Sequence, residues 1–205
     1  CSVMNSKATG EKTTVNFEHG YSISLNDKNG RDAASSILTT VRNENNIQLA
    51  LAPYYYFTSS IYEGECSSNR VALMTAKNSD TPLYLAKING KQVYELVGNY
   101  LADFDSDFYV TNKYELPIAS GMKIIVKDKE NGFSLKSIAV NEKKIDKEKE
   151  YSILLTDITM SILKKLYPEC EITQLNDTTL SSAWAAAMSK GQQPSAPEDY
   201  IEVEK

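Results

Sequence analysis

The spacing of apolar residues predicts both helices and strands in the first part of the chain. Residues 21–25 alternate between apolar and polar side chains, which is typical of a strand with one buried face. Apolar residues recur at helical spacing over 32–41, so a helix is predicted there. The continuous apolar run 47–52 predicts a buried strand, which Pro53 ends because proline cannot donate to a sheet ladder.

Similar patterns continue toward the C-terminus. They predict strands over 71–74, 83–88, 123–127, 135–140 and 151–155, and helices over 93–101, 158–166 and 180–188. The stretch 103–115 is acidic, aromatic and without a period, which predicts a loop. Its alternating Asp103, Asp105 and Asp107 suit a solvated loop or a calcium loop, although the glycine and the last glutamate of the calcium pattern are missing. Trp184 lies on the apolar face of the last helix and is expected in the core.

Together these elements predict a single folded domain. Strands and helices are interleaved without a regular strand–helix alternation, so the predicted fold class is α+β (mixed α/β), with layered sheets covered by helices. The domain is expected to span 21–192. A polar tether without periodicity is expected over 1–20, and an acidic tail over 193–205.

Composition and charge remove several classes of function. The 205 residues include 22 Lys and Arg against 27 Asp and Glu, a net charge of −5, whereas nucleic-acid binding needs a basic face. No apolar run approaches the roughly 18 residues that indicate a membrane-spanning helix. One histidine and three cysteines are too few for an imidazole-rich metal centre or a set of zinc fingers. We therefore expect neither a nucleic-acid partner nor a metal site in this chain.

The three cysteines carry different expectations. Cys1 opens the sequence, as does the lipid-carrying cysteine of a mature bacterial lipoprotein. The alternative is a piece of a longer chain that begins with cysteine by chance. Cys66 and Cys170 suit a disulfide in an oxidising compartment, but two free thiols are the simpler expectation.

Six segments share their motifs and their order with one known family. They are, in order along the chain, 30–38, 47–52, 61–65, 89–97, 116–124 and 137–157. They resemble the opening helix, the D-i-a-i-x-N strand, the l-x-x-G-x-i turn, the T-G-x-x-L helix start, the v-S-G-l strand and the v-x-v-x-G-x-x-l-d-x-x-x-x-Y-x-v-a-x stretch of that family's domain. The family is that of the 5′-nucleotidases, and the domain is their C-terminal one. The resemblance extends from Tyr21 to the last helix.

This resemblance implies a division of labour between two domains. In the family, an N-terminal metallophosphatase domain binds two divalent metal ions and cleaves phosphate, while the C-terminal domain holds the nucleoside and rotates to deliver it. The metal centre needs several His and Asp ligands, in motifs such as D-x-H, G-N-H-[DE] and G-H-x-H. This chain has only His19, which we expect at the surface. The two metals are therefore expected in a catalytic domain outside this chain, and no catalytic residue is assigned here.

The substrate side departs from the family pattern as well. Family members follow the a-i-x-N strand with Gly-Gly and an arginine, and they stack the base between two phenylalanines. Here the strand runs into Pro53 and the aromatic run 54–57. The turn over 77–82 has no phenylalanine, and Ile158 and Lys164 stand about where the second phenylalanine and an aspartate would be. The resemblance therefore covers the scaffold but not the family's nucleoside clamp.

Four aromatic side chains are the first candidates for ligand binding, namely Tyr54, Tyr55, Tyr56 and Phe57. They follow a buried strand, where a pocket is expected, and an aromatic platform there would stack a base or a sugar. The alternative is a continued strand whose rings are alternately buried and exposed. Asp157, at the end of the strand over 151–155, is the fifth candidate.

Two functional hypotheses follow. The first is a divergent, non-catalytic ligand-binding module at the bacterial cell surface, where Cys1 carries a lipid anchor. The second is the substrate-holding domain of a cell-surface nucleotide hydrolase whose metallophosphatase domain lies outside this chain. Both imply a nucleoside or another small ligand as partner, and membrane contact only through the lipid. A third hypothesis, a structural spacer, predicts no saturable small ligand.

Overall fold

The computed structural model describes residues 14–23, 31–75, 81–102, 116–130, 132–198 and 200–204. Three expectations lie outside these residues: the lipid anchor at Cys1, the calcium loop within 103–115, and most of the turn over 77–82.

A five-stranded mixed sheet forms the centre of the molecule. Its strands are, in spatial order, β10 (Ile172–Thr179), β4 (Pro82–Asn89), β9 (Glu150–Thr156), β2 (Leu49–Ala52) and β5 (Ile118–Ser120). β2 and β9 are parallel, and the other neighbouring pairs are antiparallel. All four residues of β2 are buried, as expected for a central strand with both faces covered.

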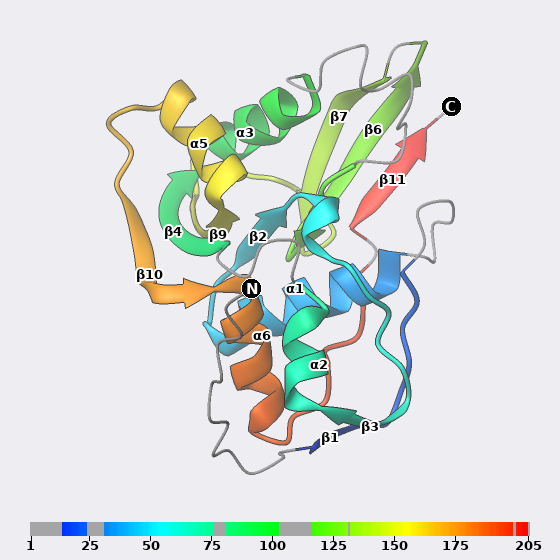
Figure 1. Ribbon diagram of the computed structural model, residues 1–205. Helices are drawn as coiled ribbons and strands as arrows, with labels where there is room; N and C mark the ends of the chain where they lie inside the picture. Colours follow the sequence, from blue (N-terminus) through cyan, green and yellow to red (C-terminus); the bar gives the residue numbers. More distant parts are fainter. Residues whose placement is uncertain are drawn as a thin grey trace, which may run out of the picture.

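Helices cover both faces of this sheet (Figure 1). α1 (Asp32–Glu44) and α6 (Leu180–Ser189) lie on one side, and α3 (Gly90–Ala102) and α5 (Asp157–Leu166) lie on the other. The short helix α2 (Ser68–Leu73) packs against α6. The resulting layers place β2 and β9 in the middle of the molecule, where they can position residues at either edge of the sheet.

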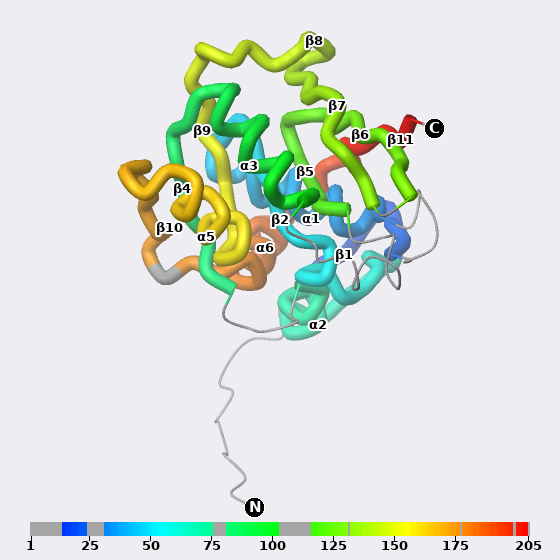
Figure 2. The backbone as a smooth tube through the Cα atoms, turned by 90° about the horizontal axis from the view of Figure 1, so that it is seen from above, coloured from blue at the N-terminus to red at the C-terminus, as the bar shows by residue number. Residues whose placement is uncertain are grey.

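A second sheet and a small ribbon complete the fold. The second sheet contains, in spatial order, β11 (Ile201–Glu204), β6 (Lys123–Lys129), β7 (Gly132–Val140) and β8 (Lys143–Lys144). β6 and β7 form an antiparallel hairpin, and β11 adds to the edge of β6 in parallel, so the three lie side by side (Figure 2). β1 (Thr14–Phe17) and β3 (Gly64–Ser67) form a separate antiparallel ribbon.

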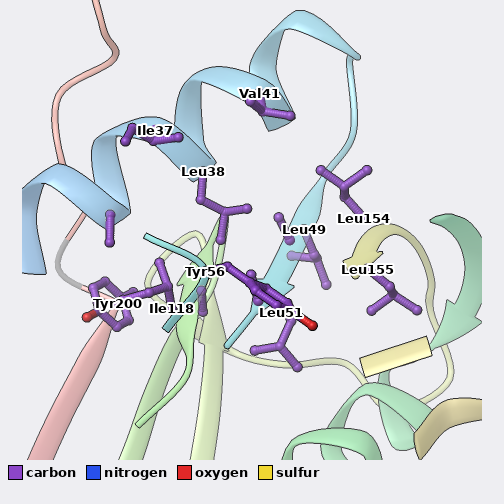
Figure 3. Packing of buried hydrophobic residues seen from close by; sticks show 14 of the residues in the cluster. Ile37, Leu38, Val41, Leu49, Leu51, Tyr56, Ile118, Leu154, Leu155 and Tyr200 are labelled. Atoms are coloured by element: carbon purple, nitrogen blue, oxygen red, sulfur yellow. The ribbon is translucent and has the colours of Figure 1, made fainter. Parts of the chain in front are cut away.

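One continuous core joins these layers. Ile37, Leu38 and Val41 of α1 face the side chains of β2 and β9 (Figure 3), which matches the helical spacing of the apolar residues. Trp184 is fully buried and stacks on Phe17 with 6.4 Å between ring centroids. The expected core position of Trp184 is therefore confirmed, and its contact fixes the β1–β3 ribbon to α6.

Most predicted elements are confirmed, including the α+β class with layered sheets and the four longer helices. The strand predicted over 71–74 is wrong, because Ser68–Leu73 form α2 and residues 74 and 75 form a turn. A run of four apolar residues cannot distinguish a strand from a short helix, and here Leu73 stays 63% exposed rather than entering the core. Of the strand predicted over 21–25, the described residues form only an isolated bridge from Tyr21 to Ile61. β1, β3, β10 and β11 were not predicted.

The expected tether over 1–20 and the expected acidic tail over 193–205 both contribute described residues to the folded domain. Within the expected tether, Thr14–Phe17 form β1. Within the expected tail, Ile201–Glu204 form β11. Lys123 pairs with Glu202 at 2.7 Å, and Lys136 pairs with Glu204 within hydrogen-bonding distance. Acidic residues that resemble a tail in sequence are here the outward side chains of an edge strand.

Two further expectations concern cysteines and membranes. Cys66 and Cys170 are both buried free thiols, which confirms the simpler of the two expectations. Burial raises the pKa of each thiol. Among the described residues, no helix has the length and apolar character needed to cross a membrane.

Candidate functional site

The parallel strands β2 and β9 bring the predicted ligand residues together. Leu49, Ala50 and Leu51 pair in parallel register with the three residues from Ile153 to Leu155, so both strands end at the same edge of the sheet. The aromatic run follows β2 and Asp157 follows β9. In open sheets, ligands bind outside the carboxyl ends of parallel strands. We call this edge the aromatic end, and it comprises Tyr54, Tyr55, Tyr56, Phe57, Asp157 and Arg31.

The aromatic run forms a tight turn rather than a continued strand. Tyr54–Tyr56 make one turn of 3₁₀ helix, which the Phe57 amide closes by donating to the Tyr54 carbonyl at 3.1 Å. Tyr54, Tyr56 and Phe57 are 4%, 5% and 4% exposed, and Tyr55 is half-buried. The rings therefore present little surface to solvent. Their role in ligand stacking stays a prediction, and it requires this edge to open.

A hydrogen bond between Tyr56 and Asp157 ties the ends of the two strands together. The Tyr56 hydroxyl donates to Oδ1 of Asp157, which also accepts the Ile158 amide at 2.8 Å. Burial, together with the neighbouring carboxylate, raises the pKa of Tyr56, so this phenol remains a protonated donor. Thr159 adds a bond from its hydroxyl to the Leu51 carbonyl at 3.3 Å. The candidate pair is thus a fixed part of the aromatic end.

Arg31 also reaches the aromatic end, although the sequence analysis did not select it. It directly precedes α1 and is 8% exposed. Its guanidinium carbon lies 4.5 Å from the ring centroid of Tyr54, and its Nη1 donates to the Leu116 carbonyl at 2.8 Å and to the Tyr200 hydroxyl at 3.4 Å. No sequence signal marks Arg31 as buried, because its contacts come from elements far along the chain.

The two phenols beside Arg31 remain neutral. Burial raises the pKa of Tyr54, and the positive charge of Arg31 offsets only part of this effect. Burial likewise raises the pKa of Tyr200 to about 12, against the opposing influence of Arg31. Neither phenol therefore supplies a negative charge to balance the guanidinium near neutral pH.

The residues that the structure describes do not fit a two-metal hydrolytic centre. Within these residues, no three His, Cys, Asp or Glu side chains gather as metal ligands would. His19 is exposed, as expected. A two-metal site holds both ions and the attacking water through several such ligands, so no hydrolytic step can be derived from this part of the chain.

A polar cleft of about 820 Å³ lies at the opposite edge of the same sheet. It is lined chiefly by residues that precede β2 and β9 and by those that follow β5 and β7, including Gln48, Gly121, Asn141, Lys149, Arg42 and Glu198. Arg42 Nη2 lies 3.0 Å from a Glu198 carboxylate oxygen, and the other carboxylate oxygen accepts the Gly121 amide at 2.6 Å. No pattern in the sequence predicts this cleft, because one of its lining residues, Glu198, comes from the expected tail.

Comparison with known proteins finds similarity at the level of the fold. No protein-family model matches the sequence, and no curated protein matches it. Among solved structures, a 5′-nucleotidase precursor from Thermus thermophilus is similar with a TM-score of 0.69 and 14% identity, over 92% of this chain and 39% of that chain. The NAD nucleotidase of Haemophilus influenzae is similar with a TM-score of 0.69 and 16% identity, over 95% of this chain and 38% of that chain. The sulfate thiohydrolase SoxB of Thermus thermophilus is similar with a TM-score of 0.61 and 15% identity, over 83% of this chain and 31% of that chain.

These similarities define the fold class. The chain has a mixed α/β fold found in 5′-nucleotidases, and the predicted resemblance to their C-terminal domain is confirmed at the level of fold. The chain spans about 39% of the length of the first of these proteins. The three similar proteins are named for different substrates, which means that this fold alone does not select a ligand.

Proposed function

We propose that this chain is a non-catalytic ligand-binding module at the bacterial cell surface, built on the 5′-nucleotidase C-terminal-domain fold. The observation that supports it most is the convergence of Tyr56 and Asp157 at the carboxyl ends of β2 and β9. Ligands of open α/β sheets bind at such an edge. The absence of a metal-ligand group among the described residues is compatible with binding rather than hydrolysis.

A ligand must displace side chains to enter the aromatic end. Tyr55 is the half-buried ring of the turn, and it contacts Tyr56 edge-on with 4.9 Å between ring centroids. Tyr55 is therefore the ring of the turn that a ligand reaches first, and Tyr56 lies directly behind this contact. We therefore assign the first contact with a base or a sugar to Tyr55 and Tyr56.

A thermal-shift titration with nucleosides, nucleotides and simple sugars tests this function. Saturable binding at about 100 times Kd stabilises the folded state by roughly 2.7 kcal/mol, which raises Tm by several degrees in a domain of this size. Tyr55→Ala should weaken that response. Tyr62→Ala removes an exposed tyrosine elsewhere and should leave it unchanged. If no compound stabilises the wild-type chain, the ligand-binding function is wrong and the structural spacer takes its place.

A second candidate is supported by the lengths of the similar structures. The chain spans 39% and 38% of the two nucleotidases, which supports a substrate-holding domain that works with a metallophosphatase domain outside this chain. The gene sequence upstream of the codon for Cys1 distinguishes the two candidates. D-x-H and G-N-H-[DE] motifs there favour the hydrolase, and a signal peptide ending directly before Cys1 favours the free-standing module.

The surface location is part of the proposal and rests on Cys1. If this residue carries a lipid, the intact mass of the protein isolated from its host exceeds the polypeptide mass by that of acyl groups. An unmodified mass, or a polypeptide that continues upstream of Cys1, would remove the proposed anchor without affecting ligand binding.

A further inference from the structure

The polar cleft has a fixed wall and the size of a ligand site. Glu198 accepts the Gly121 amide at 2.6 Å and pairs with Arg42 at 3.0 Å. Arg42 Nη1 also donates to the Gln48 carbonyl at 3.1 Å. The volume of about 820 Å³ lies within the range of about 300–1,000 Å³ that is typical of small-molecule sites. None of the lining residues belongs to the aromatic end, so the cleft is a separate space.

The charges around the cleft balance one another. Besides the ion pair of Arg42 with Glu198, Lys123 of the lining pairs with Glu202 at 2.7 Å. The remaining charged lining residues are one cation, Lys149, and one anion, Glu142, and both are exposed. Recognition of a charged ligand needs an excess of the opposite charge, which this lining does not offer. The cleft therefore favours an uncharged ligand.

Polar side chains with unused hydrogen-bonding atoms line the cleft. The Ser152 amide donates to Gln48 Oε1 at 3.0 Å, which orients the Gln48 amide. Its Nε2 donor has no hydrogen-bond partner in the described part of the chain. Within the same residues, the side chains of Asn141 and Glu142 make neither a hydrogen bond nor an ion pair. The cleft thus presents free donors and acceptors together, which suits hydroxyl groups, because a hydroxyl both donates and accepts.

The apolar part of the lining suits a sugar ring better than a nucleobase. Stacking of a base needs an open aromatic face. Tyr151 is the one aromatic residue in the described lining; it is 4% exposed, and the Lys149 ammonium lies 5.4 Å from its ring centroid. Ala139 and Val140 are partly buried and supply a small aliphatic surface. A pyranose matches this lining, because its ring face is made of C–H groups and its edge of hydroxyls.

The turn that carries Glu142 supports a role in binding. Asn141 and Glu142 form the two-residue turn between β7 and β8, with φ of 50° and 63°. Such a turn prefers glycine at its second position, because glycine adopts a positive φ freely. A glutamate there is strained, and no contact of its side chain in the described residues compensates for this. A contact with a ligand would supply that compensation.

We propose that the polar cleft is a second ligand site, which binds an uncharged saccharide. The Glu142 carboxylate accepts hydroxyl protons of the sugar, and Gln48 Nε2 and the Lys149 ammonium donate to its oxygens. The Asn141 amide can do both. This site shares no residue with the aromatic end, so it adds to the proposed function and does not depend on it.

Amide NMR and calorimetric titrations of the full chain test the site. The neutral probes are glucose, galactose, mannose, N-acetylglucosamine and cellobiose, with glucuronate and adenosine for comparison. We expect a neutral saccharide to bind saturably and to shift the amide signals of Gly121, Asn141 and Glu142 most strongly. Saturation distinguishes binding from the nonspecific stabilisation that sugars give to proteins. Glucuronate should bind no more tightly than glucose, and adenosine should leave these three signals unchanged.

Substitutions of Glu142 separate binding from folding. Glu142→Gln removes the charged acceptor and should weaken saccharide binding about tenfold, the lower limit for one hydrogen bond to a charged group. Glu142→Gly should weaken binding at least as much, although it relieves the strain of the turn. Glu130→Gln is the matched control, because Glu130 is an exposed glutamate that follows β6 outside the cleft lining. It should bind saccharide as the wild type does, and so should Tyr55→Ala.

The outcomes separate this site from the proposed function. If no saccharide shifts the cleft signals, or if both Glu142 variants bind as tightly as the wild type, the cleft site is wrong and Glu142 is a solvated turn residue. If Tyr55→Ala abolishes saccharide binding instead, the sugar binds at the aromatic end, and the proposed function stands without the second site. If glucuronate binds more tightly than glucose, the assignment to an uncharged ligand is wrong.

Discussion

The aromatic end and the polar cleft, at opposite edges of the central sheet, differ in how each accommodates a positively charged arginine. Each edge has an arginine from α1: Arg31 at its start and Arg42 in its last turn. At the polar cleft, Arg42 pairs with Glu198 at 3.0 Å, and the cleft stays open to solvent. At the aromatic end, the Arg31 guanidinium lies over the Tyr54 ring and donates to the Leu116 carbonyl and the Tyr200 hydroxyl, and both phenols are buried.

This difference concerns how the charge of each arginine is compensated. A cation near a helix C-terminus is favoured by the helix dipole, and one at the N-terminus is not. Arg42 therefore lies where its charge is stabilised twice, by the dipole and by Glu198. Arg31 lies at the other end of the helix, where the dipole opposes its charge and Asp32 of the first turn offsets part of the dipole.

The largest effect is expected at the polar cleft, from Gly121→Ala. Gly121 has φ +75°, and an added Cβ would lie 2.0 Å from the Gln48 carbonyl oxygen and 2.1 Å from Arg42 Nη1. We expect a loss of about 3–5 kcal/mol in the free energy of unfolding, because a backbone clash adds to the left-handed conformation. Urea denaturation measures this loss.

Gly191→Ala is the matched control for that substitution. Its φ is +74°, but no atom lies within 4 Å of the added Cβ. It should lose only the conformational part, roughly 1–2 kcal/mol. If the two variants lose the same free energy of unfolding, the atoms around Gly121 move to accommodate the added Cβ, and the close packing there is not rigid.

A smaller effect is expected at the aromatic end, from Tyr56→Phe. This variant keeps the ring and removes the hydroxyl that donates to Asp157. Hydrogen bonds to charged groups contribute about 1.5–3 kcal/mol, so we expect a loss near the lower limit because Asp157 is half-buried. Tyr62→Phe, at a 59% exposed position, should change stability by less than about 0.5 kcal/mol. If both variants unfold at the same urea concentration, the bond does not fix this edge.

The smallest effect is expected from Glu142→Gly, at the rim of the polar cleft. Asn141 and Glu142 have φ of 50° and 63° in the turn between β7 and β8, and a left-handed glutamate is unfavourable. Glycine should stabilise the chain by about 0.5–1 kcal/mol, since it adopts this conformation freely. Asn46→Gly, at φ 53°, should gain less because asparagine tolerates the conformation. A loss of stability in Glu142→Gly would show that the Glu142 side chain makes a compensating contact.

The sequence predicted the helices better than the strands at the sheet edges. The helices at 32–41 and 180–188 could be predicted because one face of each is buried, and that periodicity is local information. β10 was missed because its residues, Ile172–Thr179, show no clean alternation, and it pairs only at the sheet edge. β11 was missed because an edge strand with charged outward side chains has the composition of a tail.

The candidate site was predicted in part. Tyr56 and Asp157 were both selected, Tyr56 as part of the aromatic run that follows one predicted strand and Asp157 near the end of another. Their direct bond could not be predicted, since it needs the parallel pairing of β2 with β9 across 101 residues. Arg31 was missed altogether, because its partner Tyr200 lies 169 residues away.

The sequence by itself determined the mixed helix and strand pattern, the lack of a histidine-rich metal set, and the resemblance to one family of domains. These properties depend on residue type and on short spacings. The tertiary structure alone decided that the aromatic run is a buried turn, that the acidic C-terminal residues complete a sheet, and that one arginine is paired and the other is not. Burial and charge pairing are set by contacts between distant segments, which no local pattern specifies.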